Sequence, residues 1–202
     1  NKGIHYLSLA ANQNHIKSQY ELGQFYISDK NIYKDVNKGI HYLEFAANQN
    51  HVTAQFLLGC IYFNSNYGRV DLKLAIYYLK LAAKQNNKDS HSMLGLIYLS
   101  PYHSARNINK AIYHFTESAK QNDPVAQFHL GYIYYIGTDI PRDINKSLKY
   151  FALSANQGFF MSQYLLGNIY LQGEFVQQDV DKAIHLLTLA ADKNYLKAIT
   201  LL

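Results

Sequence analysis

The sequence is poor in the residues that mark several common protein classes. Its 202 residues include three prolines, 11 glycines, no tryptophan and one cysteine, Cys60. This low glycine and proline content argues against a collagen-like or β-sandwich class. A single cysteine excludes an intramolecular disulfide and any cysteine cluster for zinc or iron. It also favours a reducing compartment, so a cytoplasmic location is expected.

Long apolar runs are also absent. No stretch approaches 18 uninterrupted apolar residues, and the first twenty residues carry Asn, Gln, Lys and His where a signal peptide needs an apolar core. We therefore expect no membrane span in this segment. Because the sequence begins at Asn1 without a methionine and stops in mid-pattern, we expect it to be part of a longer protein, in which targeting signals can lie elsewhere.

The composition that remains is that of a folded domain. Hydrophobic residues make up 49% of the chain, 19 Tyr and 10 Phe supply an aromatic content of 14%, and charged residues make up only 16%. A chain with this much apolar and this little charged material is not expected to contain long disordered tails.

A strict repeat organises the whole sequence. The pair Leu-Gly recurs every 36 residues without insertion or deletion, and a tyrosine follows three residues after each glycine. The pairs begin at Leu22, Leu58, Leu94, Leu130 and Leu166. A period of this length is typical of repeat architectures, in which each unit is one supersecondary element.

Each repeat is predicted to be a helix-turn-helix unit. Ser18, Leu22 and Tyr26 lie at i, i+4 and i+8, so they share one face of a first helix, helix A. An Asp or Asn then precedes a second apolar stripe and predicts the start of helix B; these residues are Asp35, Asp71, Asn107, Asp143 and Asp179. An Asn or Gly after this stripe is typical of the left-handed conformation that ends a helix; these are Asn14, Asn50, Asn86, Asn122, Gly158 and Asn194.

One 36-residue unit cannot be stable alone, because ordering its backbone costs several tens of kcal/mol while about six buried apolar side chains return on the order of 10. Neighbouring units must therefore stack into a quasi-one-dimensional array. The expected division is a single helix B of a truncated repeat at 1–17, full repeats at 18–53, 54–89, 90–125, 126–161 and 162–197, and the start of another at 198–202. The glycine beside each leucine, unfavourable in a helix by about 1 kcal/mol, predicts close approach of a neighbouring helix.

The unit resembles the Sel1-like repeat, a relative of the tetratricopeptide repeat. That family's pattern of small-x-x-Leu-Gly-x-x-Tyr, Asp-x-x-Lys-Ala and Ala-Ala is matched by Ala126, Leu130, Gly131, Tyr134, Asp143, Lys146 and Ala155, with Ser147 at one Ala position. The family's loop glycine is present at Gly137 and Gly173 only, and Leu74 replaces the Lys in one repeat. The resemblance implies an all-α, right-handed superhelical solenoid that acts as a non-enzymatic scaffold or adaptor for protein-protein interaction. It also implies that such an array can regulate an attached enzyme, for example a kinase, outside this chain.

A face of helix A opposite the Leu-Tyr stripe is the predicted partner site. Positions equivalent to 20, 24 and 27 lie about 140 to 200 degrees from Leu22 on a helix with roughly 100 degrees per residue. In tetratricopeptide-like arrays this face is concave and takes a peptide or a helix of another protein. The predicted residues, here called the helix-A face, are Tyr20, Gln24, Phe56, Cys60, Phe63, Leu96, Leu99, Phe128, Tyr132, Tyr135, Tyr164, Asn168 and Leu171, and Ile27 and Ser92 occupy equivalent positions. Alternatively, the same side chains form core between neighbouring helices.

The nine histidines do not form a pattern typical of catalysis or metal binding. His5, His41 and His185 share one repeat position, and His15 and His51 share a turn position that favours solvated surface. His91, His103, His114 and His129 have no acidic or cysteine neighbour at ligand spacing. No phosphate-binding glycine loop, zinc-protease motif or nucleophile elbow occurs. We therefore expect no enzymatic activity, no cofactor and no metal.

A basic segment leaves open a second class of partner. The net charge of +5 and a pI near 9.0 permit binding to nucleic acid or another polyanion. Most lysines are spread along the array at one repeat position, but Arg69, Lys73, Lys80, Lys84 and Lys88 gather near one helix B. A solvated helix face is the alternative interpretation, and it makes nucleic acid the less favoured partner.

Overall fold

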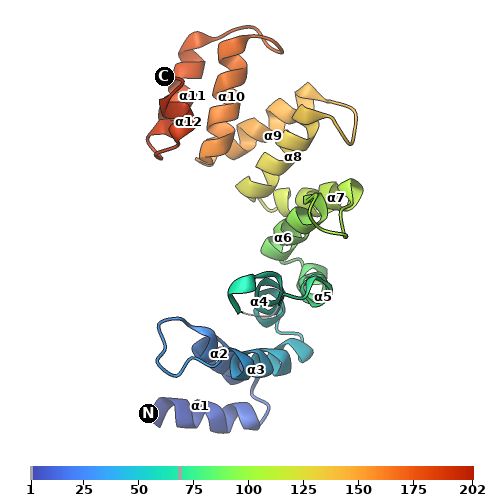
Figure 1. The fold of residues 1–202 in the computed structure, drawn as a ribbon, viewed down its shortest axis with the longest axis vertical. Helices are drawn as coiled ribbons and strands as arrows, with labels where there is room; N and C mark the ends of the chain where they lie inside the picture. The colour runs from blue at the N-terminus through green and yellow to red at the C-terminus, as the bar shows by residue number, and fades with distance from the viewer. Residues whose placement is uncertain (1, 68–69) are drawn as a thin grey trace. The chain divides into compact units, whose positions relative to one another are not determined.

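The computed structural model describes residues 2–67 and 70–202, and Arg69 of the basic segment lies outside them. The described residues form helices and no strand (Figure 1). The helices are α1 (Lys2–Asn12), α2 (Ile16–Ile27), α3 (Val36–Asn48), α4 (Val52–Phe63), the short 3-10 helix η1 (Ser65–Tyr67), α5 (Leu72–Lys84), α6 (Lys88–Leu99), α7 (Ile108–Ala119), α8 (Pro124–Ile136), α9 (Ile144–Asn156), α10 (Phe160–Gln172), α11 (Val180–Ala191) and α12 (Leu196–Ile199). Even-numbered helices are helix A and odd-numbered helices are helix B, as the repeat predicts.

The chain divides into two compact units. The N-terminal unit is Asn1–Leu94, the C-terminal unit is Gly95–Leu202, and the boundary falls inside α6. Within each unit a helix packs on its neighbours in the chain, for example α2 on α3 and α8 on α9. The all-helical repeat fold expected from the sequence is therefore confirmed. In the described part of the chain, no helix has both the length and the apolarity to cross a membrane.

Polar side chains begin helix B where the sequence predicted them. Asp35 Oδ1 accepts a hydrogen bond from the backbone N–H of Lys38 at 3.0 Å, which satisfies one free donor of the first helical turn. The equivalent residues Asp71, Asn107, Asp143 and Asp179 cap α5, α7, α9 and α11 in the same way. The predicted left-handed residues are also confirmed, with φ between 59° and 80° at Asn14, Asn50, Asn86, Asn122, Gly158 and Asn194.

The repeated glycines allow helix B to approach helix A closely. A Cβ on Gly23 would lie 2.5 Å from Leu43 Cγ, and a Cβ on Gly131 would lie 2.6 Å from Phe151 Cδ1. Both distances are far inside van der Waals contact, so only glycine fits. The expected close approach of a neighbouring helix is confirmed, and the buried leucine or phenylalanine recovers the helix stability that glycine loses.

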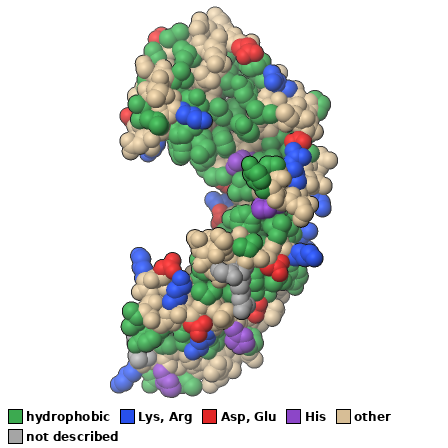
Figure 2. All heavy atoms as spheres, in the orientation of Figure 1, with side chains coloured by type: hydrophobic (Ala, Val, Ile, Leu, Met, Phe, Trp, Pro, Cys, Tyr) green, Lys and Arg blue, Asp and Glu red, His purple; other side chains and the backbone are tan. Residues whose placement is uncertain are grey.

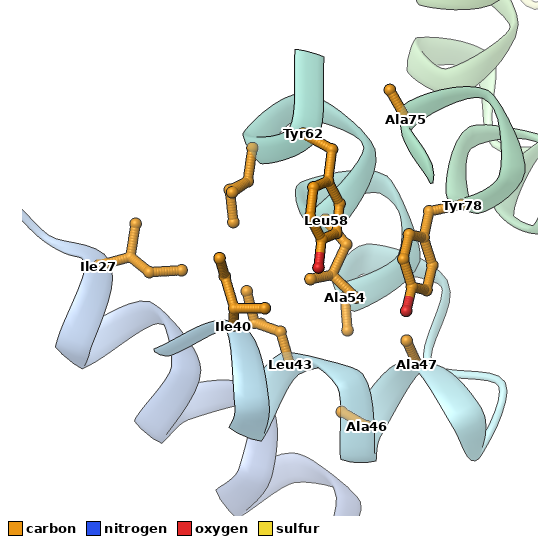
Figure 3. Close-up of a cluster of buried hydrophobic side chains, with 11 residues drawn as sticks. Ile27, Ile40, Leu43, Ala46, Ala47, Ala54, Leu58, Tyr62, Ala75 and Tyr78 are labelled. Atoms are coloured by element: carbon orange, nitrogen blue, oxygen red, sulfur yellow. The ribbon is translucent and has the colours of Figure 1, made fainter. Parts of the chain in front are cut away.

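The core lies between successive helices of a unit. In the N-terminal unit, Leu58 and Tyr62 of α4 pack between Ile40 and Leu43 of α3 and Tyr78 of α5 (Figure 3). The rings of Tyr62 and Tyr78 are nearly parallel, with centroids 5.9 Å apart. The Leu-Tyr stripe of helix A is therefore core in this unit.

Ile27, at a position equivalent to the helix-A face, also belongs to this core, in agreement with the alternative interpretation of those positions. Its side chain is 6% exposed and points toward Ile40 (Figure 3). Gly39 makes room for it, because a Cβ at that position would lie 2.5 Å from Ile27 Cγ1. Ile27 is the last residue of α2, where the following loop and α3 decide the burial.

The tyrosine and lysine positions of the repeat meet in space. Lys38 Nζ lies 4.4 Å from the ring centroid of Tyr26, and Lys182 Nζ lies 4.0 Å from that of Tyr170. Lys110 and Lys146 stand over Tyr98 and Tyr134 in the same arrangement. These lysines stabilise the hairpin through cation–π contacts. The repeat with Leu74 at this position has no such lysine.

Candidate protein-binding surface

The helix-A face is neither core nor fully exposed in either unit. Eleven of its thirteen side chains are half-buried, and Gln24 and Tyr132 are exposed. The opposite stripe is buried, with Leu22, Leu58, Leu94 and Leu130 each fully inaccessible to solvent. Half-buried aromatic side chains are anchored by their neighbours and still present a ring edge or face to the outside. This state suits a binding surface better than either extreme does.

In the N-terminal unit the helix-A face is anchored on the ends of neighbouring repeats. Tyr20 stacks on His51 with ring centroids 4.5 Å apart, and Tyr20 and Phe63 both pack on the core cluster of this unit. Burial raises the pKa of Tyr20, and a hydrogen bond with Gln24 offsets part of that effect. The phenol therefore stays neutral at physiological pH.

Cys60 contributes packing to this face. Burial raises the pKa of its thiol to about 11, and the negative charge of Asp89 adds to the shift. A thiol with such a pKa carries almost no thiolate at neutral pH, so it is a poor nucleophile and a poor metal ligand. In the described residues, no group of three or more His, Cys, Asp or Glu side chains could hold a metal ion.

In the C-terminal unit Phe128 of α8 joins several rings. Its centroid lies 6.1 Å from that of Tyr132, 6.1 Å from that of Phe151 and 5.2 Å from that of Phe159. The ring centroids of Tyr135 and Phe151 are 6.2 Å apart. Phe151 therefore anchors both Phe128 and Tyr135 of α8 to α9. The structure thus brings Phe128 and Tyr135 onto one buried phenylalanine, Phe151, while Tyr132 contacts Phe128 and stays exposed.

A small cavity lies beside these residues. Leu99 of α6 and Tyr132 of α8 line a cavity of about 180 Å³ together with Ile108 and Ile136. Its volume is enough for a side chain of a partner but small for a drug-sized ligand. Leu99 and Tyr132 of the predicted face thus line the same cavity, and Leu96, Asn168 and Leu171 are half-buried.

The row of rings continues from α8 to the end of the chain. The ring centroids of Phe159 and Phe160 are 5.7 Å apart, those of Phe160 and Tyr195 are 5.0 Å apart, and those of Tyr195 and Tyr164 are 5.2 Å apart. We call the whole series the aromatic belt, which consists of Tyr132, Phe128, Phe159, Phe160, Tyr195 and Tyr164. Figure 2 shows hydrophobic side chains gathered over α8, α9 and α10 of this unit.

Three residues of the belt were missed by the helical angle argument. Phe159, Phe160 and Tyr195 lie at or just before the first residue of a helix A. Angles measured around the helix from the position of Leu22 do not describe residues at this end, because the chain there is only entering the helix. A signal was present in the repeat alignment, because the position of Phe159 and Tyr195 is held by His15, His51, Asn87 and Asp123 in the preceding repeats.

That position is the N-cap of helix A. The side chains of His15, His51 and Asp123 accept backbone N–H bonds of the first turn, and Asn87 accepts one from Ser90 at 2.8 Å. The expectation that this column is solvated surface is wrong for His51, which is half-buried against Tyr20, and for Asp123, which is 8% exposed. Phe159 and Tyr195 provide no side-chain cap bond to α10 and α12.

Helices α8 and α10, which carry most of the belt, have no Lys, Arg, Asp or Glu, and the exposed Lys193 and Lys197 flank Tyr195 at its end. Neither α8 nor α10 contains a residue of these types, and α4 of the N-terminal unit also lacks them. The only titratable imidazole on α8, His129, has a pKa lowered to about 4 by burial, so it is neutral at physiological pH. Along α8 and α10 the surface therefore offers apolar contact, ring faces and hydroxyl groups, without formal charge from these helices.

Comparisons with known proteins agree with this architecture. The sequence model of the Sel1 repeat matches residues 1–15, 16–51, 52–87, 88–123, 124–159 and 161–195. No curated protein sequence matches the chain.

Solved structures with the same fold come from several bacteria. A protective antigen of uropathogenic Escherichia coli that displays an SLR fold superposes with a TM-score of 0.88 at 26% identity, over 96% of this chain and 42% of the antigen. This chain thus spans less than half of that relative. A Sel1 repeat protein from Oxalobacter formigenes has a TM-score of 0.80 at 25% identity, over 92% and 76% of the two chains. Cysteine rich protein B of Helicobacter pylori shares the fold at 21% identity, with a TM-score of 0.53 over 65% of this chain and 95% of that one.

Proposed function

Because the chain belongs to the Sel1-repeat family, we propose that it is a scaffold that binds a peptide or helix of another protein on the helix-A face. Sel1-repeat proteins are generally protein-protein interaction scaffolds, and their fold is typically non-catalytic. The finer proposal concerns this chain: the aromatic belt of the C-terminal unit is the main contact surface, and the partner segment is apolar and largely uncharged.

The loss of two helix caps carries this proposal. A polar N-cap stabilises a helix by about 1 kcal/mol relative to an apolar residue, and the first four repeats use one. Phe159 and Tyr195 give up that stability and instead extend a row of rings that begins at Tyr132. Departures from a local stability rule are expected at functional sites.

The chemistry of the belt indicates its partner. Aromatic side chains dominate binding energy at protein interfaces because they bury much area and lose little conformational entropy. Along α8 and α10, charged partner residues would lose hydration without an ion pair from these helices in return. The partner is therefore expected to insert apolar side chains between the rings, with affinity that changes little with salt.

The test is affinity capture with the purified protein and with the variant Phe128→Ala, Tyr132→Ala. We expect captured proteins to be lost from the variant and retained by the control Tyr102→Ala, Tyr113→Ala, which removes two exposed aromatic side chains outside the helix-A face. Circular dichroism must show that both variants are folded. Retention of every captured protein by the folded Phe128→Ala, Tyr132→Ala variant would show that the belt is not the contact surface.

A further inference from the structure

Helix α5 carries lysines that the repeat does not require. Lys73 replaces the Asn, Asn, Asn and Asp of residues 37, 109, 145 and 181, and Lys80 replaces the Glu, Thr, Ala and Thr of residues 44, 116, 152 and 188. Lys84 corresponds to Asn48, Asn156 and Asp192 and to Lys120, which forms an ion pair with Glu117. The same repeat lacks the lysine that stands over a tyrosine elsewhere, since Leu74 occupies that position. This helix therefore lost the structural lysine and gained others.

The lysines share one side of α5 with apolar residues. Angles around the α5 axis are measured here from Leu74, at about 100 degrees per residue. Leu81 lies about 20 degrees from Leu74. On the same side, Tyr77 and Lys84 lie about 60 to 80 degrees from Leu74, and Lys73 and Lys80 lie about 100 to 120 degrees from it. We call this side the α5 stripe, and it consists of Lys73, Leu74, Tyr77, Lys80, Leu81 and Lys84. The buried residues of α5, which are Ala75, Tyr78, Leu79, Ala82 and Ala83, lie outside the stripe.

The stripe is accessible from solvent. All three lysines are exposed, Tyr77 is 54% exposed, and Leu74 is 38% exposed. One edge of the stripe is thus apolar, the other edge is basic, and an exposed tyrosine stands between them. The lysines extend over roughly 16 Å along the helix, since each residue advances 1.5 Å.

Neighbouring acidic groups do not neutralise these lysines. Among the described residues, none forms an ion pair with Lys73, Lys80 or Lys84, and α5 itself contains no Asp or Glu. On the adjoining elements, the carboxylate of Asp71 caps α5, that of Glu44 accepts a hydrogen bond from Tyr62, and that of Asp89 lies in the first turn of α6, where its charge acts on Cys60. The positive charge of the stripe is therefore available to a partner.

We propose that the α5 stripe is a second docking surface, which binds an acidic amphipathic helix of a partner protein. Carboxylates on one edge of that helix would meet Lys73, Lys80 and Lys84, and its apolar edge would cover Leu74 and Tyr77. Charge complementarity sets the orientation, and the apolar contact supplies area that ion pairs at the surface do not. This surface lies in the N-terminal unit and does not depend on the function proposed for the aromatic belt.

Two other anionic partners fit the stripe less well. Three lysines over this length neutralise only a few phosphates, which gives weak nucleic-acid binding at physiological salt, and the apolar edge would stay uncovered. A helix on an anionic bilayer buries its apolar face several ångströms into the lipid. Leu81 is half-buried in the protein core cluster and cannot insert in this way.

The experiment uses the whole chain and two labelled 14-residue peptides with leucines at heptad core positions, one with glutamates and one with lysines at the other positions. Fluorescence anisotropy at 50 mM NaCl measures their affinities. We expect the acidic peptide to bind and the basic peptide not to bind. The variant Lys73→Glu, Lys80→Glu, Lys84→Glu should weaken the acidic peptide about tenfold or more, because it replaces three attractions with repulsions. Tyr77→Ser should weaken it severalfold through lost apolar contact.

Two controls separate this surface from net charge and from the aromatic belt. Lys149→Glu, Lys193→Glu, Lys197→Glu makes the same change in net charge on exposed lysines of the C-terminal unit and should leave the affinity unchanged. Phe128→Ala, Tyr132→Ala should also leave it unchanged. Equal affinity for both peptides, or unchanged binding after charge reversal on α5, would overturn the proposal. So would a preference for a 20-nucleotide oligothymidine or for phosphatidylserine vesicles that is lost in the α5 variant, since it would assign the stripe to nucleic acid or to lipid.

Discussion

At the scale of single residues, Ser147 of α9 is a buried polar group without a partner. Its side chain is fully buried, and its Oγ has no hydrogen bond in the described structure. Ala75, Ala111 and Ala183 occupy the same position in other repeats. Removing the hydroxyl also removes its desolvation cost. We expect Ser147→Ala to raise the free energy of unfolding by about 1 kcal/mol, measured by urea denaturation.

A matched serine should respond in the opposite direction. Ser154 Oγ, also on α9, donates a hydrogen bond to the carbonyl oxygen of Pro124 at 2.7 Å. Ser154→Ala leaves that carbonyl without this donor, so we expect a loss of about 1 to 2 kcal/mol. Equal effects of the two substitutions would mean that hydrogen bonding does not control stability at these sites.

His129 makes the stability of the C-terminal unit depend on pH. The ring of His129 stacks on that of Phe115, with ring centroids 4.9 Å apart. Burial lowers the pKa of His129 from 6.5 to about 4, although the charge of Asp123 opposes the shift. Between these two pH values the unfolded chain binds a proton at this residue and the folded chain does not. The stability that His129 contributes is therefore complete above pH 6.5 and is lost as the pH falls toward 4.

The test is His129→Leu, because Leu57 and Leu165 occupy this position in other repeats. Urea unfolding at pH 7, 5.5 and 4.5 should show that the natural protein loses on the order of 2 to 3 kcal/mol more than the variant over this range. His185→Leu, an exposed site on α11, is the control and should leave the pH dependence in place. Identical pH profiles for the natural protein and His129→Leu would contradict the prediction.

At the scale of secondary-structure elements, the N-cap residues of helix A differ between the repeats. Substitutions at Phe159 can show whether the free energy of unfolding is lower because an aromatic residue of the belt replaces a polar cap. Phe159→Asn and Phe159→Ala both remove the ring that packs between Phe128 and Phe160, but only Asn can cap α10. We therefore expect Phe159→Asn to be more stable than Phe159→Ala by about 1 kcal/mol in urea denaturation. Both variants should bind a belt partner more weakly than the natural protein.

The two kinds of helix start also show how much the sequence predicts. Asp35 and its equivalents precede an apolar stripe, and the structure confirms every one as a cap of helix B. His15 and His51 were not predicted as caps of helix A, because a ring nitrogen accepts such a bond only when the turn places it correctly. For Ile27 the sequence left burial and exposure as alternatives, since its burial depends on the absence of a side chain at Gly39 in the next helix.

The binding surface was less predictable than the fold for a related reason. Periodicity identifies which side of a helix is buried, and the Leu-Tyr stripe followed it in α2 and α4. The belt instead joins α8, the start of α10 and the residue before α12, so its continuity depends on contacts between helices. Only a change of residue type at one repeat position, from polar to Phe159 and Tyr195, indicated it in the sequence.

At the scale of the whole molecule, the pattern of contacts between helices predicts how far along the chain a destabilising substitution acts. Helices pack on their neighbours in the chain, as α9 packs on α8 and α10, so each repeat is coupled mainly to the adjacent repeats. A substitution that forces one helix pair apart should therefore reduce protection locally. Gly131→Ala does this, because its Cβ would lie 2.6 Å from Cδ1 of the fully buried Phe151.

We expect Gly131→Ala to cost about 1 to 3 kcal/mol, since a packed core resists an added methyl group. Hydrogen exchange measured by mass spectrometry should show faster exchange in α8, α9 and α10 and unchanged exchange in α1 to α3. Gly23→Ala creates the same clash with Leu43 and should give the reciprocal result, with faster exchange in α2 and α3 and unchanged exchange in α10 and α11. Faster exchange along the whole chain in either variant would mean that the repeats unfold as one cooperative body. In that case a partner bound at the aromatic belt would stabilise every helix, whereas nearest-neighbour coupling confines that effect to the C-terminal unit.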